Sequence, residues 1–203
     1  MKKIIVINGP ATSGKNTFIK AVRAMLKEAD ILVYSFSSIF PIKDELFKTG
    51  QWDGKTKGET ERNLMIDLKA KMIKDGDKPL KYLVSQINSK SEGIFFVHIR
   101  EKDEIEKFIE TCKINLDITP FTLHYDRLAK DNLNTTAEIY TREYNNYDFD
   151  IIAGEGLNSV KAAAIDVIRK VGINELSTTT SDDEINNAIF HKEFDDELSA
   201  GYA

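Results

Sequence analysis

Short apolar runs alternate along this chain with longer segments in which apolar residues recur every three or four positions. The runs predict buried strands at residues 3–8, 31–34, 93–99 and 149–153, and a further strand within residues 114–125 that ends at 123–125. The recurring positions predict amphipathic helices at residues 15–28, 42–49, 59–74, 79–89, 102–112, 135–144 and 157–171. Alternation of this kind is typical of an α/β domain, in which a parallel sheet lies between two layers of helices.

The pattern changes near residue 173. Residues 1–172 have the length and apolar content of one domain, whereas residues 173–203 are polar and acidic. Ser181 and Glu184 could cap a short amphipathic helix within this tail. The helix could pack on the domain or on a second copy of the chain in a homodimer, and a solvated tail fits the pattern equally well.

A glycine-rich loop directly follows the first predicted strand and directly precedes a predicted helix. It consists of Gly9, Pro10, Ala11, Thr12, Ser13, Gly14, Lys15, Asn16 and Thr17. Glycine, four residues, glycine and lysine in this context are typical of a phosphate-binding loop, because backbone N–H groups can then surround an anion. The positive end of the following helix and the charge of Lys15 add to the attraction. We therefore expect the loop to bind a nucleoside triphosphate.

The residue after the lysine departs from the usual pattern. Serine or threonine commonly stands there and its hydroxyl binds Mg²⁺, but here the position holds Asn16 and the hydroxyl comes one residue later, at Thr17. The Gly-Lys-x-Thr variant resembles that of nucleoside monophosphate kinases. We expect Thr17 to contact the metal ion.

Composition and charge narrow the classes of partner. The formal net charge is −5, which argues against a nucleic acid or an anionic membrane as partner. Cys112 is the single cysteine, so an internal disulfide is excluded and a reducing compartment fits. The apolar run at the start ends at Gly9 and is too short for a signal peptide or a membrane span. These features together predict a cytoplasmic protein.

Arginine is rare in this chain, since only six of its 28 basic residues are arginines. Arg62, Arg100, Arg127 and Arg142 lie beside predicted strand ends or loops, where a planar fork could bind phosphate. Phosphoryl transfer needs several cations around the migrating group, so we expect some of them to act in catalysis. The alternative for each of these four arginines is a surface salt bridge. For the remaining two arginines of the chain, a surface salt bridge is the preferred interpretation.

Four segments in order resemble the P-loop nucleoside monophosphate kinases, and among them the phage-type deoxynucleoside monophosphate kinases. The segments are residues 7–17, 35–43, 98–105 and 147–157. The resemblance implies a three-layer α/β/α P-loop NTPase fold with a five-stranded parallel sheet and a short lid at residues 127–146. It also implies ATP and Mg²⁺ as cofactors and small-molecule nucleotides as substrates.

The resemblance also implies roles for individual residues. Lys15 would contact the transferring phosphoryl group, and Arg127 and Arg142 would close over the phosphates with the lid. The residues that would border the acceptor monophosphate are Ser37, Lys43, Trp52, Arg62 and Arg100.

One position departs from that family. His98 stands where the related enzymes have an acidic residue that orients the water shell of the metal ion. Either the metal depends on Thr17, the phosphates and another acid, Asp126 or Glu101, or catalysis is weak. A strand-end histidine satisfied by hydrogen bonds is the simpler interpretation of His98.

Three functions remain open at this stage. The leading one is phosphoryl transfer from ATP to a nucleoside monophosphate. The second keeps the chemistry but changes the acceptor to another small phosphorylated metabolite, as in phosphomevalonate kinase. The third is a non-catalytic nucleotide-binding module that regulates a partner through residues 176–203.

Overall fold

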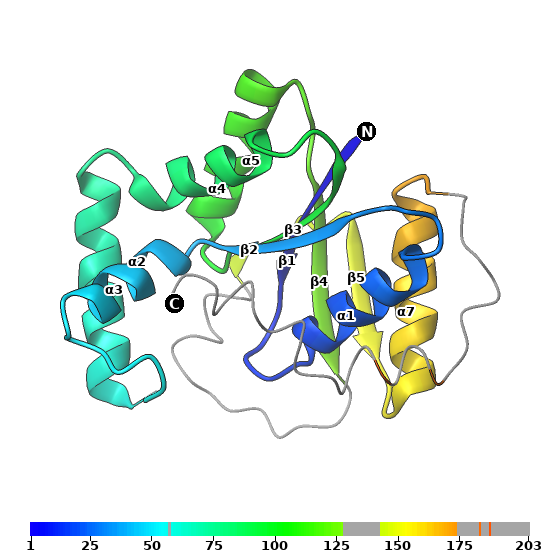
Figure 1. The fold of residues 1–203 in the computed structure, drawn as a ribbon, viewed down its shortest axis with the longest axis horizontal. Coiled ribbons are helices and arrows are strands. Elements are labelled where there is room, and N and C mark those ends of the chain that lie inside the picture. Colours follow the sequence, from blue (N-terminus) through cyan, green and yellow to red (C-terminus); the bar gives the residue numbers. More distant parts are fainter. Residues whose placement is uncertain (57, 128–142, 174–182, 184–186, 188–203) are drawn as a thin grey trace.

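The computed structural model describes residues 1–56, 58–127, 143–173, 183 and 187, and within them five strands form one parallel sheet. The strands are β1 (Lys2–Asn8), β2 (Val33–Ser37), β3 (Gly93–His98), β4 (Phe121–Arg127) and β5 (Phe149–Ala153). Their order in the sheet is β2-β3-β1-β4-β5. The strand that leads into the glycine-rich loop therefore lies in the middle of the sheet (Figure 1).

Helices connect the strands and cover the sheet. They are α1 (Lys15–Leu26), α2 (Phe40–Lys48), α3 (Glu59–Lys74), α4 (Lys78–Asn88), α5 (Lys102–Leu116) and α7 (Leu157–Lys170). Successive side chains of a strand point to opposite faces of a sheet. In β1, Ile5 and Ile7 accordingly pack with α1 and α7, while Ile4 and Val6 pack with α4 and α5. The predicted three-layer α/β/α architecture with a five-stranded parallel sheet is confirmed, and its strand–loop–helix start is that of the P-loop NTPase fold.

A smaller hydrophobic cluster joins α2 to α3 beside the sheet (Figure 1). Its buried members are Ile42, Leu46, Trp52 and Met72. We call α2, α3 and the loop between them the helical arm. Because α3 packs mainly on α2 and α4, the arm has its own small core and few contacts with the strands.

The strand register brings four loops to the same edge of the sheet. Ser37 of β2 and Ile7 of β1 both pair with His98 of β3, and Asn8 pairs with His124 of β4. All strands run in the same direction, so the segments that follow β1, β2, β3 and β4 meet at the carboxyl edge. In open parallel sheets this edge is where ligands bind.

Most predicted elements are present, and their boundaries differ for local reasons. Strand β2 begins at Val33 rather than residue 31, because the N–H group of Ile31 still donates to the Leu26 carbonyl (3.2 Å) and ends the preceding turn. Helix α2 begins before the predicted residue 42, with Pro41 in its first turn, where its missing N–H group costs nothing. Most of the predicted helix at 135–144, of the lid at 127–146 and of the tail lies outside the described residues.

The structure also bears on the single cysteine and on membrane-spanning helices. Cys112 of α5 is fully buried, and burial raises the pKa of its thiol to about 12, as expected of a core cysteine. Across the described residues, every helix is too short or too polar to span a bilayer.

Replacing Gly9 by alanine should destabilise the protein strongly. Gly9 has a φ of +137°, and a β-carbon there would lie 2.1 Å from the Tyr125 carbonyl oxygen. We expect the free energy of unfolding, measured by urea denaturation, to fall by about 3 kcal/mol or more. Gly50 is the matched control, because it has a φ of +70° but open space around it. Gly50→Ala should cost only about 1 kcal/mol, and an equal loss in both variants would contradict the role of the close approach.

Candidate functional site

The glycine-rich loop forms a tight turn between β1 and α1. Gly9 and Gly14 have φ values of +137° and +89°, and Thr12 also adopts a left-handed conformation at +63°. The Ser13 N–H group donates to the Pro10 carbonyl oxygen (3.3 Å), which closes the turn. Gly14 occupies the N-cap of α1 and has no side chain that could cap the helix. The N-terminal N–H groups of α1 are thus suited to an anion.

The Lys15 side chain folds back over this loop. Its ammonium group donates to the carbonyl oxygens of Gly9 (2.9 Å) and Pro10 (2.6 Å) and to the Ser13 hydroxyl (3.2 Å). Burial and the nearby positive charge of Arg100 lower the pKa of Lys15 to about 8, against the opposing effect of Asp126. The ammonium group is therefore still protonated at pH 7, but in a position that a negative charge would stabilise further.

Arg100 and Arg127 bring two further positive charges to the loop. Arg100 follows β3, is exposed, and acts electrostatically on Lys15. Arg127 ends β4 and lies against the loop, since a β-carbon at Gly14 would be 3.4 Å from its Cδ atom and 3.6 Å from Nη1. The structure thus brings together three of the four predicted catalytic residues. The fourth, Arg142, lies outside the described residues.

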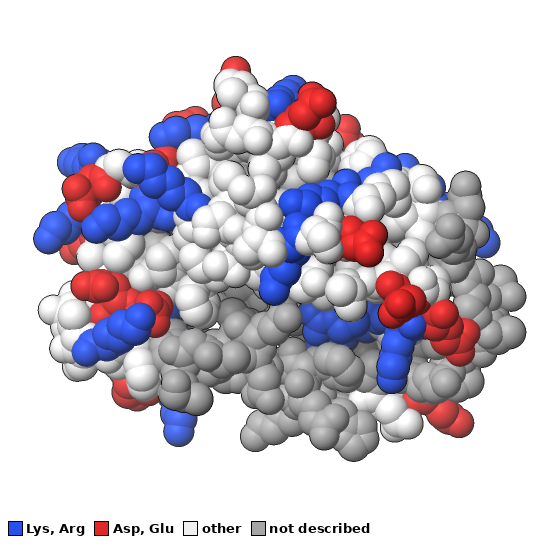
Figure 2. All heavy atoms as spheres, turned by 45° about the horizontal axis from the view of Figure 1, so that its top comes forward, with Lys and Arg blue, Asp and Glu red and all other residues white. Residues whose placement is uncertain are grey.

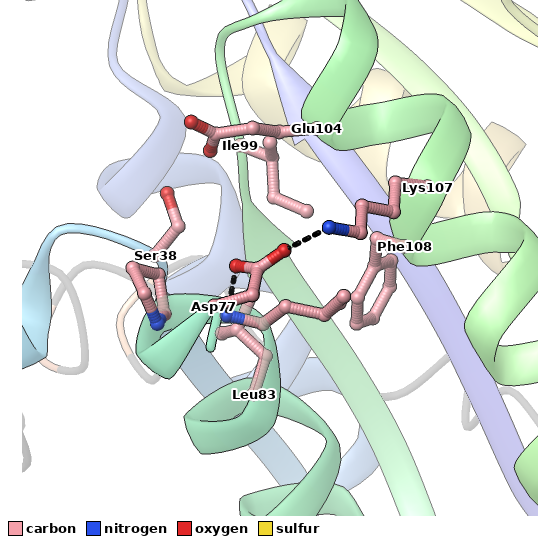
Figure 3. A pocket seen from close by; sticks show the side chains of 9 residues that line it. Ser38, Asp77, Leu83, Ile99, Glu104, Lys107 and Phe108 are labelled. Atoms are coloured by element: carbon pink, nitrogen blue, oxygen red, sulfur yellow. Dashed lines mark hydrogen bonds and ion pairs between the residues drawn. The ribbon is translucent and has the colours of Figure 1, made fainter. Parts of the chain in front are cut away.

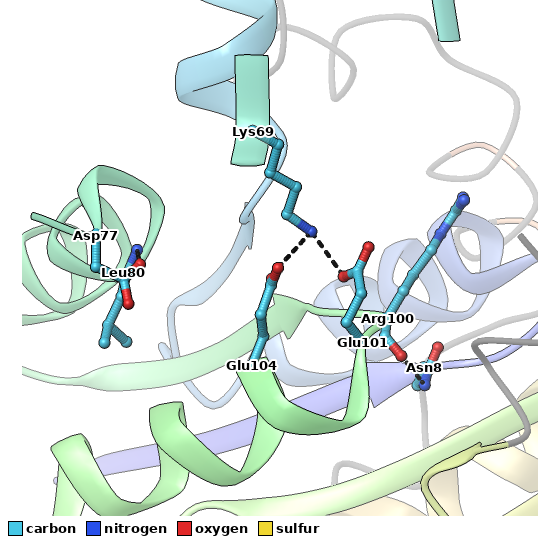
Figure 4. Close-up of polar contacts among 7 residues, drawn as sticks. All are labelled: Asn8, Lys69, Asp77, Leu80, Arg100, Glu101 and Glu104. Atoms are coloured by element: carbon cyan, nitrogen blue, oxygen red, sulfur yellow. Dashed lines mark hydrogen bonds and ion pairs between the residues drawn. The ribbon is translucent and has the colours of Figure 1, made fainter. Parts of the chain in front are cut away.

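Buried Asn8 links the loop to its neighbours. Its Oδ1 atom accepts the Gly9 N–H group (2.7 Å), and its Nδ2 atom donates to the Arg100 carbonyl oxygen (3.2 Å) and the Tyr147 hydroxyl (2.8 Å). Figure 4 shows Asn8 beside the Arg100 backbone. One amide therefore fixes the start of the glycine-rich loop relative to the segment that carries Arg100. Sequence analysis assigned no role to Asn8, although a polar residue at the end of an apolar strand was a usable signal.

His98 lies at the end of β3, beside the same cations. Its Nε2 atom is 3.1 Å from the Ser35 hydroxyl, and its carbonyl oxygen accepts the Ser38 N–H group (3.1 Å). Burial, followed by the charges of Lys15 and Arg100, lowers the pKa of His98 to about 3. The imidazole is therefore neutral at physiological pH and adds no charge to the site.

Glu101 and Asp126 were named as substitutes for the missing acid, and the structure gives them different partners. Glu101 is committed to an ion pair with Lys69, at 2.7 Å. Asp126, at the end of β4, accepts the Arg127 N–H group through Oδ1 (2.7 Å) and raises the pKa of Lys15 by its charge. Of the two acids, Asp126 is accordingly the one whose charge acts on Lys15.

Apart from Arg100, the predicted acceptor-binding residues are spread over β2 and the helical arm. Ser37 ends β2 directly beside His98, and Arg62 is exposed near the start of α3. Trp52 is only 7% exposed, its Nε1 atom donates to the Thr56 carbonyl oxygen (2.6 Å), and the Lys43 ammonium lies 5.7 Å from its ring centre. The indole thus presents little surface for stacking on a base.

A small hollow of about 20 Å³ lies between α4, α5 and the ends of β2 and β3 (Figure 3). Its floor is apolar, with Leu83, Ile99 and Phe108, and its rim carries Asp77 and Glu104. Asp77 accepts the Leu80 N–H group (3.4 Å) and pairs with a lysine of α5, and Glu104 pairs with Lys69 of the arm. The rim carboxylates are thus used to join helices.

The surface drawn in Figure 2 has mixed charge. On this face, lysine and arginine side chains are interspersed with aspartate and glutamate side chains rather than gathered into one continuous basic area. This distribution is in keeping with the net charge of −5.

Comparison with known proteins gives limited guidance. No protein-family model and no curated protein matches the chain. Among solved structures, it is similar to a mutant of the APS kinase CysC from Mycobacterium tuberculosis, with 15% identity, a TM-score of 0.48, and coverage of 83% of this chain and 95% of that one. It is also similar to the tunicamycin resistance protein of Deinococcus radiodurans, with 16% identity, a TM-score of 0.49, and coverage of 86% and 98%. Similarity at this level carries no conclusion about substrate.

The low pKa of His98 has a consequence for stability. The unfolded chain takes up a proton near pH 6.5, whereas folded His98 takes it up only near pH 3, so this residue stabilises the fold above pH 6.5 and the contribution is lost as the pH falls. The free energy of unfolding of the wild type should fall between pH 7 and pH 4.5. In His98→Gln this fall should be smaller by at least about 1 kcal/mol. Urea denaturation at the two pH values measures this. An imidazole NMR signal of His98 that titrates between pH 5 and 7 would contradict the assignment.

Proposed function

We propose that this protein transfers a phosphoryl group from ATP to the phosphate of a nucleoside monophosphate and forms the diphosphate. The observation that carries the proposal is the convergence of Lys15, Arg100 and Arg127 on one glycine-rich turn at the carboxyl edge of the sheet. The cations come from segments that are distant in sequence, at the start of α1, after β3 and at the end of β4. The chain keeps Lys15 and Arg100 together although their charges repel each other. A polyphosphate would relieve that repulsion.

The chemistry follows from where each group lies. ATP phosphates would bind the N–H groups of the turn and of the start of α1, and Lys15 would exchange its carbonyl partners for phosphate oxygens. An oxygen of the acceptor phosphate attacks the γ-phosphorus, the bond to the bridging oxygen of ADP breaks, and ADP leaves. Negative charge spreads over the equatorial oxygens of the moving group, where Lys15 and Arg127 would stabilise it.

The residues present fit a magnesium ion. Mg²⁺ prefers hard oxygen ligands and binds proteins through one or two carboxylates together with substrate phosphates. Thr17 in the first turn of α1 and Asp126 beside Lys15 supply a hydroxyl and a carboxylate at the loop. The ion would neutralise charge on the phosphates, while these two residues would orient its ligands. Arg142 and the lid at residues 127–146 remain predictions for the exclusion of water.

The packing of Trp52 favours a second candidate acceptor. Its indole is buried in the core of the helical arm and is therefore poorly placed to stack on a base. A small phosphorylated metabolite without a base would need only the phosphate-binding groups, such as Arg100. The chemistry of transfer is the same for both acceptors, so substrate screening must include both classes.

A coupled assay of ADP release distinguishes these proposals. Ribonucleoside and deoxynucleoside monophosphates and small phosphorylated alcohols and acids are offered as acceptors with ATP and Mg²⁺. We expect turnover with at least one nucleoside monophosphate. Turnover with a metabolite alone selects the second candidate, and ATP binding without any turnover selects a non-catalytic nucleotide-binding module.

Lys15→Ala is the variant that tests the proposed site. The variant lacks the positive charge that would contact the phosphates, so kcat/KM should fall by a factor of about 100 or more. Lys27→Ala is the matched control, because Lys27 is exposed at the opposite end of the same helix and should leave turnover unchanged. Equal activity of Lys15→Ala and the wild type would refute the proposal.

Asp126→Asn should weaken the effect of Mg²⁺ on ATP binding. We expect calorimetry to show that Mg²⁺ improves ATP affinity about 10-fold less in this variant than in the wild type, because a neutral amide is a poorer ligand of the ion. Asp150→Asn is the control, since Asp150 pairs with His124 on the neighbouring strand. An unchanged Mg²⁺ effect in Asp126→Asn would assign the ion to other ligands.

A further inference from the structure

A buried lysine connects the helical arm to the loop that carries Arg100. Lys69 of α3 is 9% exposed, and its ammonium nitrogen lies 2.7 Å from Glu101 Oε2 and 2.8 Å from Glu104 Oε1 (Figure 4). Glu101 is the N-cap of α5 and Glu104 lies in its first turn. A single ammonium group thus holds two carboxylates that belong to another element, more than 30 residues further along the chain.

Arg100 immediately precedes one of these carboxylates. Figure 4 shows the Arg100 side chain extending away from Glu101, which is turned toward Lys69. Over the described ranges, no carboxylate lies within ion-pair distance of Arg100. Against the effect of burial, the charge of Lys69 and, to a smaller extent, that of Arg100 lower the pKa of Glu101. The carboxylate is therefore ionised and within the electrostatic reach of both cations.

The balance of charge shows what Lys69 prevents. The cluster contains two acidic residues and one lysine, and burial raises the pKa of Glu104 although Lys69 opposes it. Without Lys69, Glu101 would be a partly buried carboxylate next to the guanidinium of Arg100. Such pairs form short, frequently bidentate hydrogen bonds. An acceptor phosphate would then have to displace Glu101 before it could bind Arg100.

We propose that Lys69 is a positioning residue that holds Glu101 away from Arg100 and so keeps the guanidinium group available to the acceptor phosphate. The proposal rests on the proposed function, in which Arg100 binds the acceptor. It assigns a role to a residue of the arm that lies outside the predicted nucleotide-binding residues. A purely structural role, in which Lys69 only attaches α3 to α5, is the alternative that the experiment must separate.

Lys69→Met should raise the KM for the acceptor by a factor of about 10 or more, because hydrogen bonds to charged groups contribute that much to affinity. The dissociation constant for ATP should change less than about twofold, since the glycine-rich loop is untouched. Lys69→Arg keeps the charge and should preserve the wild-type KM. Steady-state kinetics and ATP calorimetry measure the two effects.

A pair of double variants separates positioning from attachment. Lys69→Met with Glu101→Gln removes the competing carboxylate and should restore the acceptor KM to within about threefold of the wild type. Lys69→Met with Glu104→Gln is the matched control, because it removes the same charge but leaves Glu101 beside Arg100, and it should not restore KM. Restoration by neither double variant, or by both equally, would overturn the proposal and indicate a structural role.

NMR without substrate tests whether Lys69 holds Glu101 away from Arg100, whatever reaction the protein catalyses. In Lys69→Met, the Arg100 Nε–H signal in ¹⁵N NMR should shift and exchange more slowly with water, as expected of a guanidinium paired with a carboxylate. The added Glu101→Gln change should reverse both effects. If Lys69→Met does not fold, Lys69→Gln removes the same charge and carries the same expectations. An Arg100 signal that does not change in the single variant would refute the proposal even if the wild type proves to be a kinase.

Discussion

Repulsion between Lys15 and Arg100 at the carboxyl edge of the sheet, where Arg127 adds a third positive charge, is the constraint on which the rest of this site depends. Lys15 begins α1 after the glycine-rich loop, Arg100 follows β3 and Arg127 ends β4, and all three side chains are positively charged. A fold holds such groups together only if other interactions fix their backbones. The apolar faces of the five strands supply most of that free energy, and the Asn8 amide fixes the loops that carry two of the cations. The cost of the repulsion is recovered when an anion binds.

The same constraint explains how acidic residues are distributed around the site. A carboxylate paired with one of these cations would occupy the place of a phosphate. Glu101 is the nearest in sequence to Arg100, and it is held by Lys69 of the helical arm. Asp126 is retained beside Lys15, but one of its oxygens accepts the Arg127 backbone N–H group. Each carboxylate near the site therefore has a partner that directs part of its charge away from the arginine side chains.

The sequence was sufficient for features that depend on neighbours along the chain. The glycine-rich loop was found from local spacing, and the strands and the helices that cover them were found from their apolar periodicity. Boundaries shift by a few residues at β2 and α2, and at β4 the strand begins only at Phe121 because α5 continues to Leu116. Interactions between distant segments could not be found in this way. Lys69 resembles any lysine on an exposed helix until α5 is placed beside it, and the burial of Trp52 depends on the packing of α2 against α3.

His98 shows how the cations determine the chemistry that the site can use. A carboxylate at this position would be drawn into a pair with Lys15 or Arg100, whereas the imidazole is kept neutral first by burial and then by the charges of these two residues. Its hydrogen bond with Ser35 can then form without a change in charge. His98 therefore leaves the positive charge of the loop undiminished on the β3 side. Of the two acids near the site, Glu101 is paired with Lys69, and Asp126 of β4 is the one whose charge acts on Lys15. Any metal ion bound with the triphosphate would therefore be oriented from β4, beside Arg127, and the acceptor phosphate would approach from β3, where Arg100 lies.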